Sequence, residues 1–186
     1  GTYRPGASLL VANHVSWLDI LAVHAVCPQA RFVSKADVRH WPLMGWLVGA
    51  VGTLFIERER KRDALRVVHQ TADALRAGDT VAVFPEGTTG DGHALLPFHA
   101  NLLQAAIATG TPIQPVALRY SQPGHDVSPA VAWLGDTTLL SSVWTIAMAD
   151  GLGVRVTALS PQGSEHADRR ALADHLMQLI TAAMPR

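Results

Sequence analysis

Short apolar runs alternate with segments of helical periodicity along this chain, and that alternation constrains its fold more than any other feature. The runs are bounded by Gly, Pro or polar residues, as expected of strands covered on both faces. Because strands that alternate with helices usually pair in parallel, we expect an α/β fold with a mainly parallel central sheet flanked by helices. No repeat or long linker interrupts the pattern, so residues 1–186 are expected to form a single domain.

The bounds of the expected elements follow from apolar spacing and from Gly and Pro at segment ends. The predicted strands are Ser8–Ala12, Arg31–Ser34, Thr53–Glu57, Thr80–Phe84, Pro112–Tyr120 and Val154–Leu159, with a weaker apolar run at Val131–Leu134. The predicted helices are Ser16–Val26, Pro42–Ala50, Arg62–Ala77, Asn101–Thr109, Leu139–Met148 and His166–Met184. Pro115 lies inside a predicted strand and has no N–H to donate, which favours an edge strand or a bulge there.

Composition excludes several classes of protein. Hydrophobic residues make up 48% of the chain and charged residues 16%, which argues against disorder. The formal net charge is zero, so no nucleic-acid partner is expected. Cys27 is the only cysteine, which excludes an intrachain disulfide and a cysteine-based zinc site. None of the nine histidines pairs closely with a carboxylate on one helix face, so no metal is expected.

The start of the chain has no initiator Met and no signal segment, and it leads almost directly into an apolar strand. We therefore expect the domain to be truncated at its N-terminus. The longest apolar stretch, Trp41–Ile56, is too short for a membrane span and contains several glycines. A buried core segment is the favoured interpretation of this stretch, and a membrane-dipping surface is the alternative.

The first candidate motif is His14 with Asp19, at the junction of a predicted strand and a predicted helix. A reaction in which an alcohol attacks needs a base that removes the hydroxyl proton, and histidine suits that role near neutral pH. A carboxylate on the other ring nitrogen would set the tautomer and stabilise the imidazolium. Five helical steps would turn Asp19 away from His14, so His14 is expected in the turn before the helix. Taken alone, such a pair is often coincidental, with His14 capping a helix and Asp19 solvated.

A second candidate motif, Phe84-Pro85-Glu86-Gly87-Thr88, directly follows the fourth predicted strand. Glu86 is expected at the strand end, and Gly87 would let the backbone approach a ligand closely. Backbone N–H groups in such a turn can bind an oxyanion or a phosphate. The alternative is an ordinary turn with a surface Glu.

A third candidate motif runs from Gly52 to Arg58. An Arg at a strand end can hold a phosphate through two hydrogen bonds. The following cations, Arg60–Arg62, are better explained as a solvated helix start balanced by neighbouring glutamates.

In their order along the chain, these three motifs, followed by Pro112 and Pro115, resemble those of the glycerolipid acyltransferase family, which includes bacterial lysophosphatidate acyltransferases. The resemblance covers about Leu10 to Leu118. It implies that His14 is the general base, that Asp19 orients it, and that no covalent acyl-enzyme forms. It also implies a set of substrate-binding residues, with Arg58 and Lys35 at the acceptor head group: Lys35, Gly52, Arg58, Glu86, Gly87 and Thr88.

The resemblance further implies the partners of the reaction. A fatty acyl group would pass from acyl-CoA or acyl carrier protein, as co-substrate rather than cofactor, to a lysolipid. The most favoured acceptor is 1-acylglycerol-3-phosphate, which would give phosphatidic acid. The implied location is the cytoplasmic face of the inner membrane, at the membrane surface, with peripheral attachment or an anchor in a missing N-terminal segment.

Two positions depart from the family pattern. Thr89 stands where an Arg often follows the second motif, and Phe98-His99-Ala100-Asn101 replaces a common Phe-Lys-x-Gly. Since both changes remove groups that could serve a phosphate, lyso-ornithine lipid is an alternative acceptor.

Two other classes of function stay open from the sequence. One is a hydrolase, although the Gly-x-Ser-x-Gly elbow is absent and the nearest serine to the base is Ser16. The other is a non-catalytic lipid-binding module.

Overall fold

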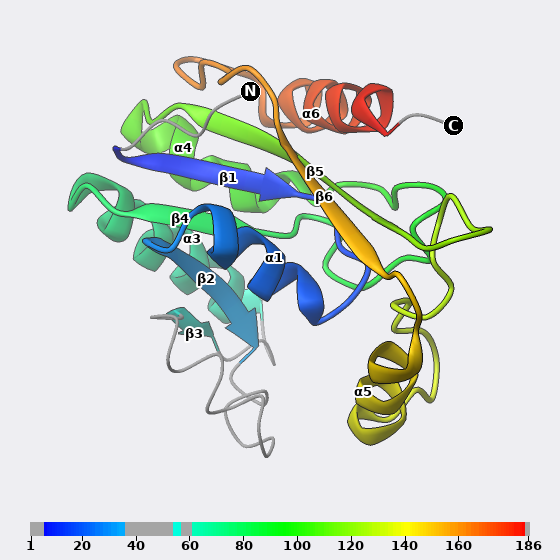
Figure 1. Cartoon of the computed structure of the whole chain (residues 1–186). Coiled ribbons are helices and arrows are strands. Elements are labelled where there is room, and N and C mark those ends of the chain that lie inside the picture. The colour runs from blue at the N-terminus through cyan, green and yellow to red at the C-terminus, as the bar shows by residue number, and fades with distance from the viewer. Residues whose placement is uncertain (1–5, 36–53, 57–60, 185–186) are drawn as a thin grey trace.

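The computed structural model describes residues 6–35, 54–56 and 61–184, and Figure 1 shows the whole chain. Its strands are β1 (Ser8–Ala12), β2 (Ala30–Lys35), β3 (Leu54–Ile56), β4 (Thr80–Val83), β5 (Ile113–Ser121) and β6 (Gly153–Ala158). Its helices are α1 (Leu18–Val26), α3 (Lys61–Arg76), the 3-10 helix η2 (Ala100–Leu103), α4 (Gln104–Thr109), α5 (Leu139–Met148) and α6 (Arg169–Ala183).

The six strands form one sheet in the order β3-β2-β4-β1-β5-β6. All neighbouring strands pair in parallel except β5 and β6, which are antiparallel. The prediction of a mainly parallel α/β sheet is therefore confirmed. The carboxyl ends of β1, β4 and β5 meet at one edge, where ligands bind in folds of this kind.

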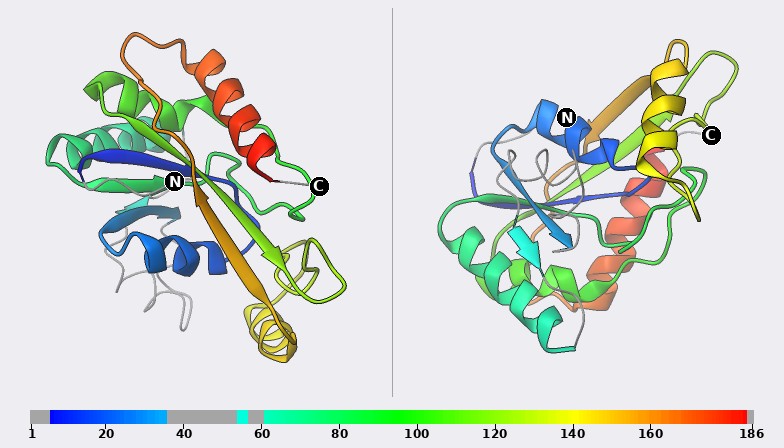
Figure 2. Two further views of the ribbon diagram at one scale, coloured as in Figure 1. Left: turned by 45° about the horizontal axis from the view of Figure 1, so that its top comes forward. Right: turned by 90° about the horizontal axis from the view of Figure 1, so that it is seen from below.

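The two faces of the sheet carry separate apolar cores, because alternate residues of a strand point to opposite sides. Leu9 and Val11 of β1 pack with residues of α3, α4 and α6, whereas Leu10 and Ala12 pack with residues of α1. Figure 2 shows α1 on one face and these three helices on the other. Strands buried on both sides explain why their sequences read as continuous apolar runs.

Most predicted elements are present, and their ends differ from the prediction by at most three residues. The predicted helix Asn101–Thr109 divides into η2 and α4, and α1 begins at Leu18 rather than Ser16. The apolar run Val131–Leu134 is not a strand but part of an irregular segment. The predicted helix Pro42–Ala50 lies outside the described residues.

The expectation of an edge strand at Pro115 is wrong, because β5 lies between β1 and β6. The alternative, a bulge, fits the pairing. Two residues lie between Ile113 and Val116, but three lie between their partners Gln162 and Ala158. The extra residue interrupts the ladder at the position where Pro115 lacks an N–H, although its carbonyl still accepts from Leu159 N at 2.9 Å.

Within the described ranges, no helix combines the length and the apolar character that crossing a bilayer would require. Of the apolar stretch Trp41–Ile56, the structure describes only β3, which is a short strand of the sheet.

Candidate active site

His14 lies in the turn between β1 and α1, and Asp19 lies in the first turn of α1. The His14 Nδ1 atom is 2.7 Å from Asp19 Oδ2. This geometry confirms that Asp19 reaches back to His14, as the five-residue spacing predicted. The His14 side chain is 21% exposed while that of Asp19 is fully buried, so only the histidine can meet a substrate.

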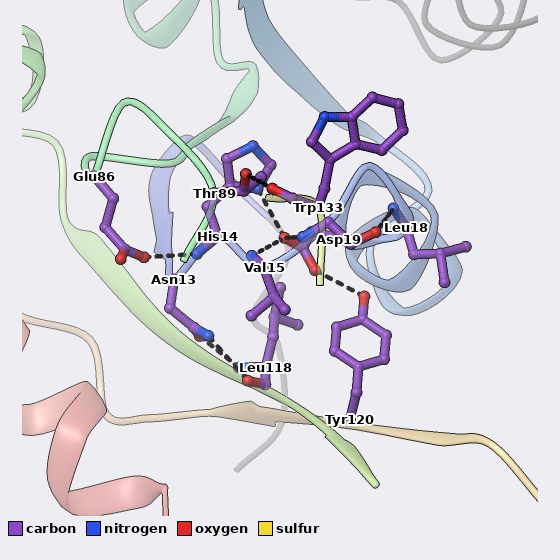
Figure 3. A network of polar contacts seen from close by, with 11 residues as sticks. Asn13, His14, Val15, Leu18, Asp19, Glu86, Thr89, Leu118, Tyr120 and Trp133 are labelled. Atoms are coloured by element: carbon purple, nitrogen blue, oxygen red, sulfur yellow. Dashed lines mark hydrogen bonds and ion pairs between the residues drawn. The ribbon is translucent and has the colours of Figure 1, made fainter. Parts of the chain in front are cut away.

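The Asp19 carboxylate accepts four hydrogen bonds (Figure 3). Besides His14, its Oδ2 atom accepts from Val15 N at 2.6 Å and from Ser16 N at 2.9 Å. Its Oδ1 atom accepts from the Tyr120 hydroxyl at 2.8 Å. These donors compensate for the loss of solvation and hold the carboxylate in one position.

Tyr120 is a member of this network that the sequence did not reveal. It is the penultimate residue of β5 and is 3% exposed. Burial raises the pKa of its phenol far above the usual value, and the neighbouring Asp19 carboxylate adds to that shift. The phenol therefore stays protonated and acts as a donor. The only signal in the sequence was a tyrosine at the carboxyl end of a buried strand.

The His14 imidazole is held by its ring face as well as by Asp19. It stacks on Phe84 with ring centroids 4.3 Å apart and an angle of 15° between the planes. Because a carboxylate only accepts hydrogen bonds, Nδ1 is the donor and Nε2 carries the lone pair. In the described part of the chain, Nε2 has no hydrogen-bond partner, so it is available to a substrate hydroxyl.

Glu86 joins the second motif to the first. Its Oε1 atom accepts from His14 N and its Oε2 atom accepts from Leu96 N, both at 2.7 Å. The side chain is 4% exposed, so the alternative of a surface Glu is wrong. Burial raises the pKa of Glu86, and the two backbone hydrogen bonds oppose that shift. In this structure Glu86 fixes the backbone of the turn that carries His14.

The loop after Glu86 begins with Gly87, whose φ of 72° is in the left-handed region that favours glycine. Its N–H closes a turn on the Phe84 carbonyl at 3.1 Å. Thr88 is exposed, and the Thr89 hydroxyl donates to the carbonyl of Trp133. Thr89 therefore links this loop to the segment that precedes α5.

Asn13 is a second residue whose part in the site the sequence did not reveal. Its side chain is 1% exposed and hydrogen bonds to both backbone groups of Leu118. The Asn13 Oδ1 atom accepts from Leu118 N at 2.7 Å, and Nδ2 donates to Leu118 O at 3.0 Å. It thus ties the end of β1 to β5 immediately before His14.

Of three further residues predicted to bind substrate, the structure describes only one. Lys35 is the last residue of β2, and its partner in β3 is Ile56. Gly52 and Arg58 lie outside the described residues, so their expected contact with the acceptor stays a prediction.

An apolar groove of about 270 Å³ lies between α1 and the start of β6. It is lined by Tyr120 together with apolar side chains that include Leu18, Leu21 and Leu152. Because Tyr120 also contacts Asp19, the groove reaches the hydrogen-bond network of Asp19 from the α1 side. Among the residues that the structure describes, no group of three or more His, Cys, Asp or Glu side chains is arranged to hold a metal ion.

The chain is similar in sequence to a known protein family and to characterised proteins. A family profile described as Acyltransferase matches residues 2–119. The chain is 39% identical over 176 residues to the lyso-ornithine lipid O-acyltransferase of Pseudomonas aeruginosa, covering 95% of this chain and 67% of that protein. It is 38% identical over 184 residues to the 1-acyl-sn-glycerol-3-phosphate acyltransferase of Neisseria meningitidis, covering 97% of this chain and 71% of that protein.

A solved structure shares the fold. The crystal structure of the 1-acyl-sn-glycerophosphate (LPA) acyltransferase PlsC from Thermotoga maritima matches with a TM-score of 0.64 and 18% identity. The match covers 98% of this chain and 66% of that chain. The present chain thus spans about two thirds of the length of these relatives.

Proposed function

Because this chain belongs to the acyltransferase family, we propose that it transfers a fatty acyl group from a thioester donor to the hydroxyl of a lysolipid. The observation that carries the proposal is the contact of His14 Nδ1 with the buried carboxylate of Asp19, which leaves Nε2 as the basic nitrogen. A histidine held in this way is equipped to remove a proton from an alcohol.

The reaction is a direct transfer. The acceptor hydroxyl gives its proton to His14 Nε2 while its oxygen attacks the carbonyl carbon of the thioester. The resulting tetrahedral intermediate collapses, the carbon–sulfur bond breaks, and the proton passes from His14 to the departing thiolate. Asp19 stabilises the imidazolium that exists between these two proton transfers.

The surroundings of Ser16 support a mechanism without an acyl-enzyme. Ser16 is fully buried, and its hydroxyl oxygen faces the N–H of Leu18 at 3.4 Å. A nucleophilic serine needs an exposed oxygen within reach of its base. Among the described residues, no hydrogen bond joins Ser16 to the His14 ring. The hydroxyl that attacks is therefore assigned to the acceptor.

The donor in this proposal is acyl-CoA or acyl carrier protein, and no resident cofactor takes part. Because the proposed acceptor is a lipid, the proposed location of the protein is a membrane surface, at the cytoplasmic face of the inner membrane.

The first candidate acceptor is 1-acylglycerol-3-phosphate, the acceptor in the name of the Neisseria relative. Lyso-ornithine lipid is the second candidate, since the Pseudomonas relative carries that name. The structure adds one observation in favour of the second. Thr89 occupies a position where the family often has Arg. Its hydroxyl donates a hydrogen bond to the backbone of Trp133, and it carries no positive charge that could attract a phosphate.

A panel of lysolipids offered with one labelled acyl donor tests the acceptor. Acylation of 1-acylglycerol-3-phosphate at a kcat/KM well above that of lyso-ornithine lipid supports the first candidate, and the reverse order supports the second. Release of free fatty acid without acceptor, at the rate of transfer, would instead indicate a hydrolase.

Two substitutions test the chemistry. His14→Ala should lower kcat by about 10²–10⁴-fold or more, the usual contribution of general-base catalysis, while the fold survives. Asp19→Asn keeps the shape of the side chain but removes its charge, so kcat should fall in the same range. Full activity in His14→Ala would overturn the proposal, and vesicle binding without turnover in the unaltered protein would favour a lipid-binding module.

A further inference from the structure

Helix α5 exposes a row of large apolar side chains. Leu140 is 81% exposed, Trp144 is 68% exposed and Met148 is 67% exposed. Their spacing of four residues places them on one side of the helix, and we refer to these three residues as the α5 stripe. The helix contains no charged residue. Large apolar side chains gathered in this way usually mark an interaction surface.

The α5 stripe lies at the same edge of the sheet as the catalytic turn. In Figure 1, α5 lies beyond the ends of the parallel strands, just before β6. The first residue of β6, Gly153, pairs with Ser121, the last residue of β5. Val154, the next residue of β6, is 45% exposed and also lines the apolar groove. The apolar groove that reaches Tyr120 therefore lies at the start of the strand that follows α5.

Two hydrogen bonds hold this region to the first motif. Trp17 Nε1 donates to Ser142 Oγ at 3.0 Å, which joins α5 to the start of α1. Trp133 N donates to Val15 O at 3.1 Å, next to the catalytic histidine. A surface that contacts the α5 stripe would therefore lie at a fixed position relative to His14.

The size of the stripe disfavours a second copy of the chain as its partner. A whole Trp side chain buries at most about 250 Å². Three partly exposed side chains, the largest of them Trp, fall short of the roughly 800 Å² per partner that a stable protein interface buries. Insertion into a bilayer has no such requirement, because an uncharged apolar helix face gains free energy for each side chain that enters the lipid.

We propose that the α5 stripe docks the active site on a phospholipid bilayer, inserting Leu140, Trp144 and Met148 below the headgroups. This inference rests on the proposed function, since an enzyme that acylates a bilayer lipid must bring its catalytic turn to the bilayer surface. Because the helix is uncharged, docking depends on apolar contact rather than on anionic lipid.

The test uses the chain with Leu140, Trp144 and Met148 each replaced by Ser, together and singly. The control is Leu65→Ser, which removes an equally exposed apolar side chain (65%) on α3, across the sheet from α1. Binding to phosphatidylcholine vesicles is measured by flotation at low and high salt. Trp144→Ser should weaken partition about tenfold or more, the triple variant further, and the control should bind as the unaltered chain does.

Activity separates this inference from the function on which it rests. Each variant is assayed with acceptor in vesicles and with a short-chain lysolipid that stays monomeric in water. The ratio of vesicle to monomer turnover should fall with the stripe substitutions only. Equal vesicle binding by the triple variant and the control would overturn the docking surface, as would a dimer that the same substitutions abolish. Vesicle binding through the stripe, without acylation of any lysolipid, would overturn the proposed function alone.

Discussion

The Tyr120 phenol donates a 2.8 Å hydrogen bond to the Asp19 oxygen that does not face His14. The two residues are 101 positions apart, and the contact brings the end of β5 to the start of α1. Since Oδ2 already has three donors, Tyr120 is the sole partner of Oδ1 among the described side chains. It sets the rotation of the carboxylate on which His14 depends.

Tyr120→Phe is therefore expected to lower kcat about tenfold with little change in KM, because Asp19 keeps its charge but loses one constraint on its orientation. The free energy of unfolding should fall by about 1.5–3 kcal/mol, which is the usual contribution of a hydrogen bond to a charged group. Steady-state kinetics and urea denaturation measure the two effects. Gln114→Met is the control, since it removes a buried hydrogen bond at the other end of β5. It should lower stability and leave kcat unchanged.

Replacement of Glu86 tests the raised pKa of its carboxyl. A raised pKa in the folded state means that this carboxyl stabilises the fold most when protonated. That contribution is complete below the usual value of 4.5 and is lost as pH rises through the higher pKa of the folded protein. The stability lost in Glu86→Gln should therefore shrink as pH rises from about 4.

Urea denaturation at a series of pH values measures this difference. Glu165→Gln, at an exposed position, is the control for removal of one acidic group. A destabilisation by Glu86→Gln that grows with pH would contradict the direction of the shift.

Asn13→Ala should destabilise the fold strongly. It would leave the buried N–H and C=O of Leu118 without their partners, and each such group costs about 1–3 kcal/mol. Thermal unfolding measures the loss. Asn101→Ala, at an exposed position on η2, should have a much smaller effect. Equal effects of the two changes would mean that the Asn13 bridge does not stabilise the sheet.

Gly87→Ala tests the backbone of the loop after Glu86. At a φ of 72° a Cβ costs about 1–2 kcal/mol, so stability should fall by that amount. Gly163→Ala is the control, because Gly163 lacks a positive φ and a Cβ there would meet no atom within 4 Å. If Gly87 also shapes the acceptor pocket, the KM for the lysolipid should rise while that for the acyl donor does not. An unchanged KM for the lysolipid would mean that Gly87 only allows the backbone conformation of the loop and does not shape the acceptor pocket.

The sequence by itself determined the class of the fold and the position of the His14–Asp19 pair. Apolar runs mark buried strands because a strand covered on both faces must be apolar throughout. The contact of His14 with Asp19 was also predictable, since both residues belong to one turn and the spacing limits where the turn can lie. Both features depend only on residues that are close together in the sequence, so they can be predicted without knowing how the strands are arranged.

Only the tertiary structure decided which distant groups complete the site. Tyr120, Glu86 and Leu118 reach the first motif through the order of the strands, and apolar periodicity does not encode that order. For the same reason the inward direction of Glu86 and the interior position of β5 were not predictable. Long-range contacts depend on which strands become neighbours, and that choice is settled by packing over the whole sheet.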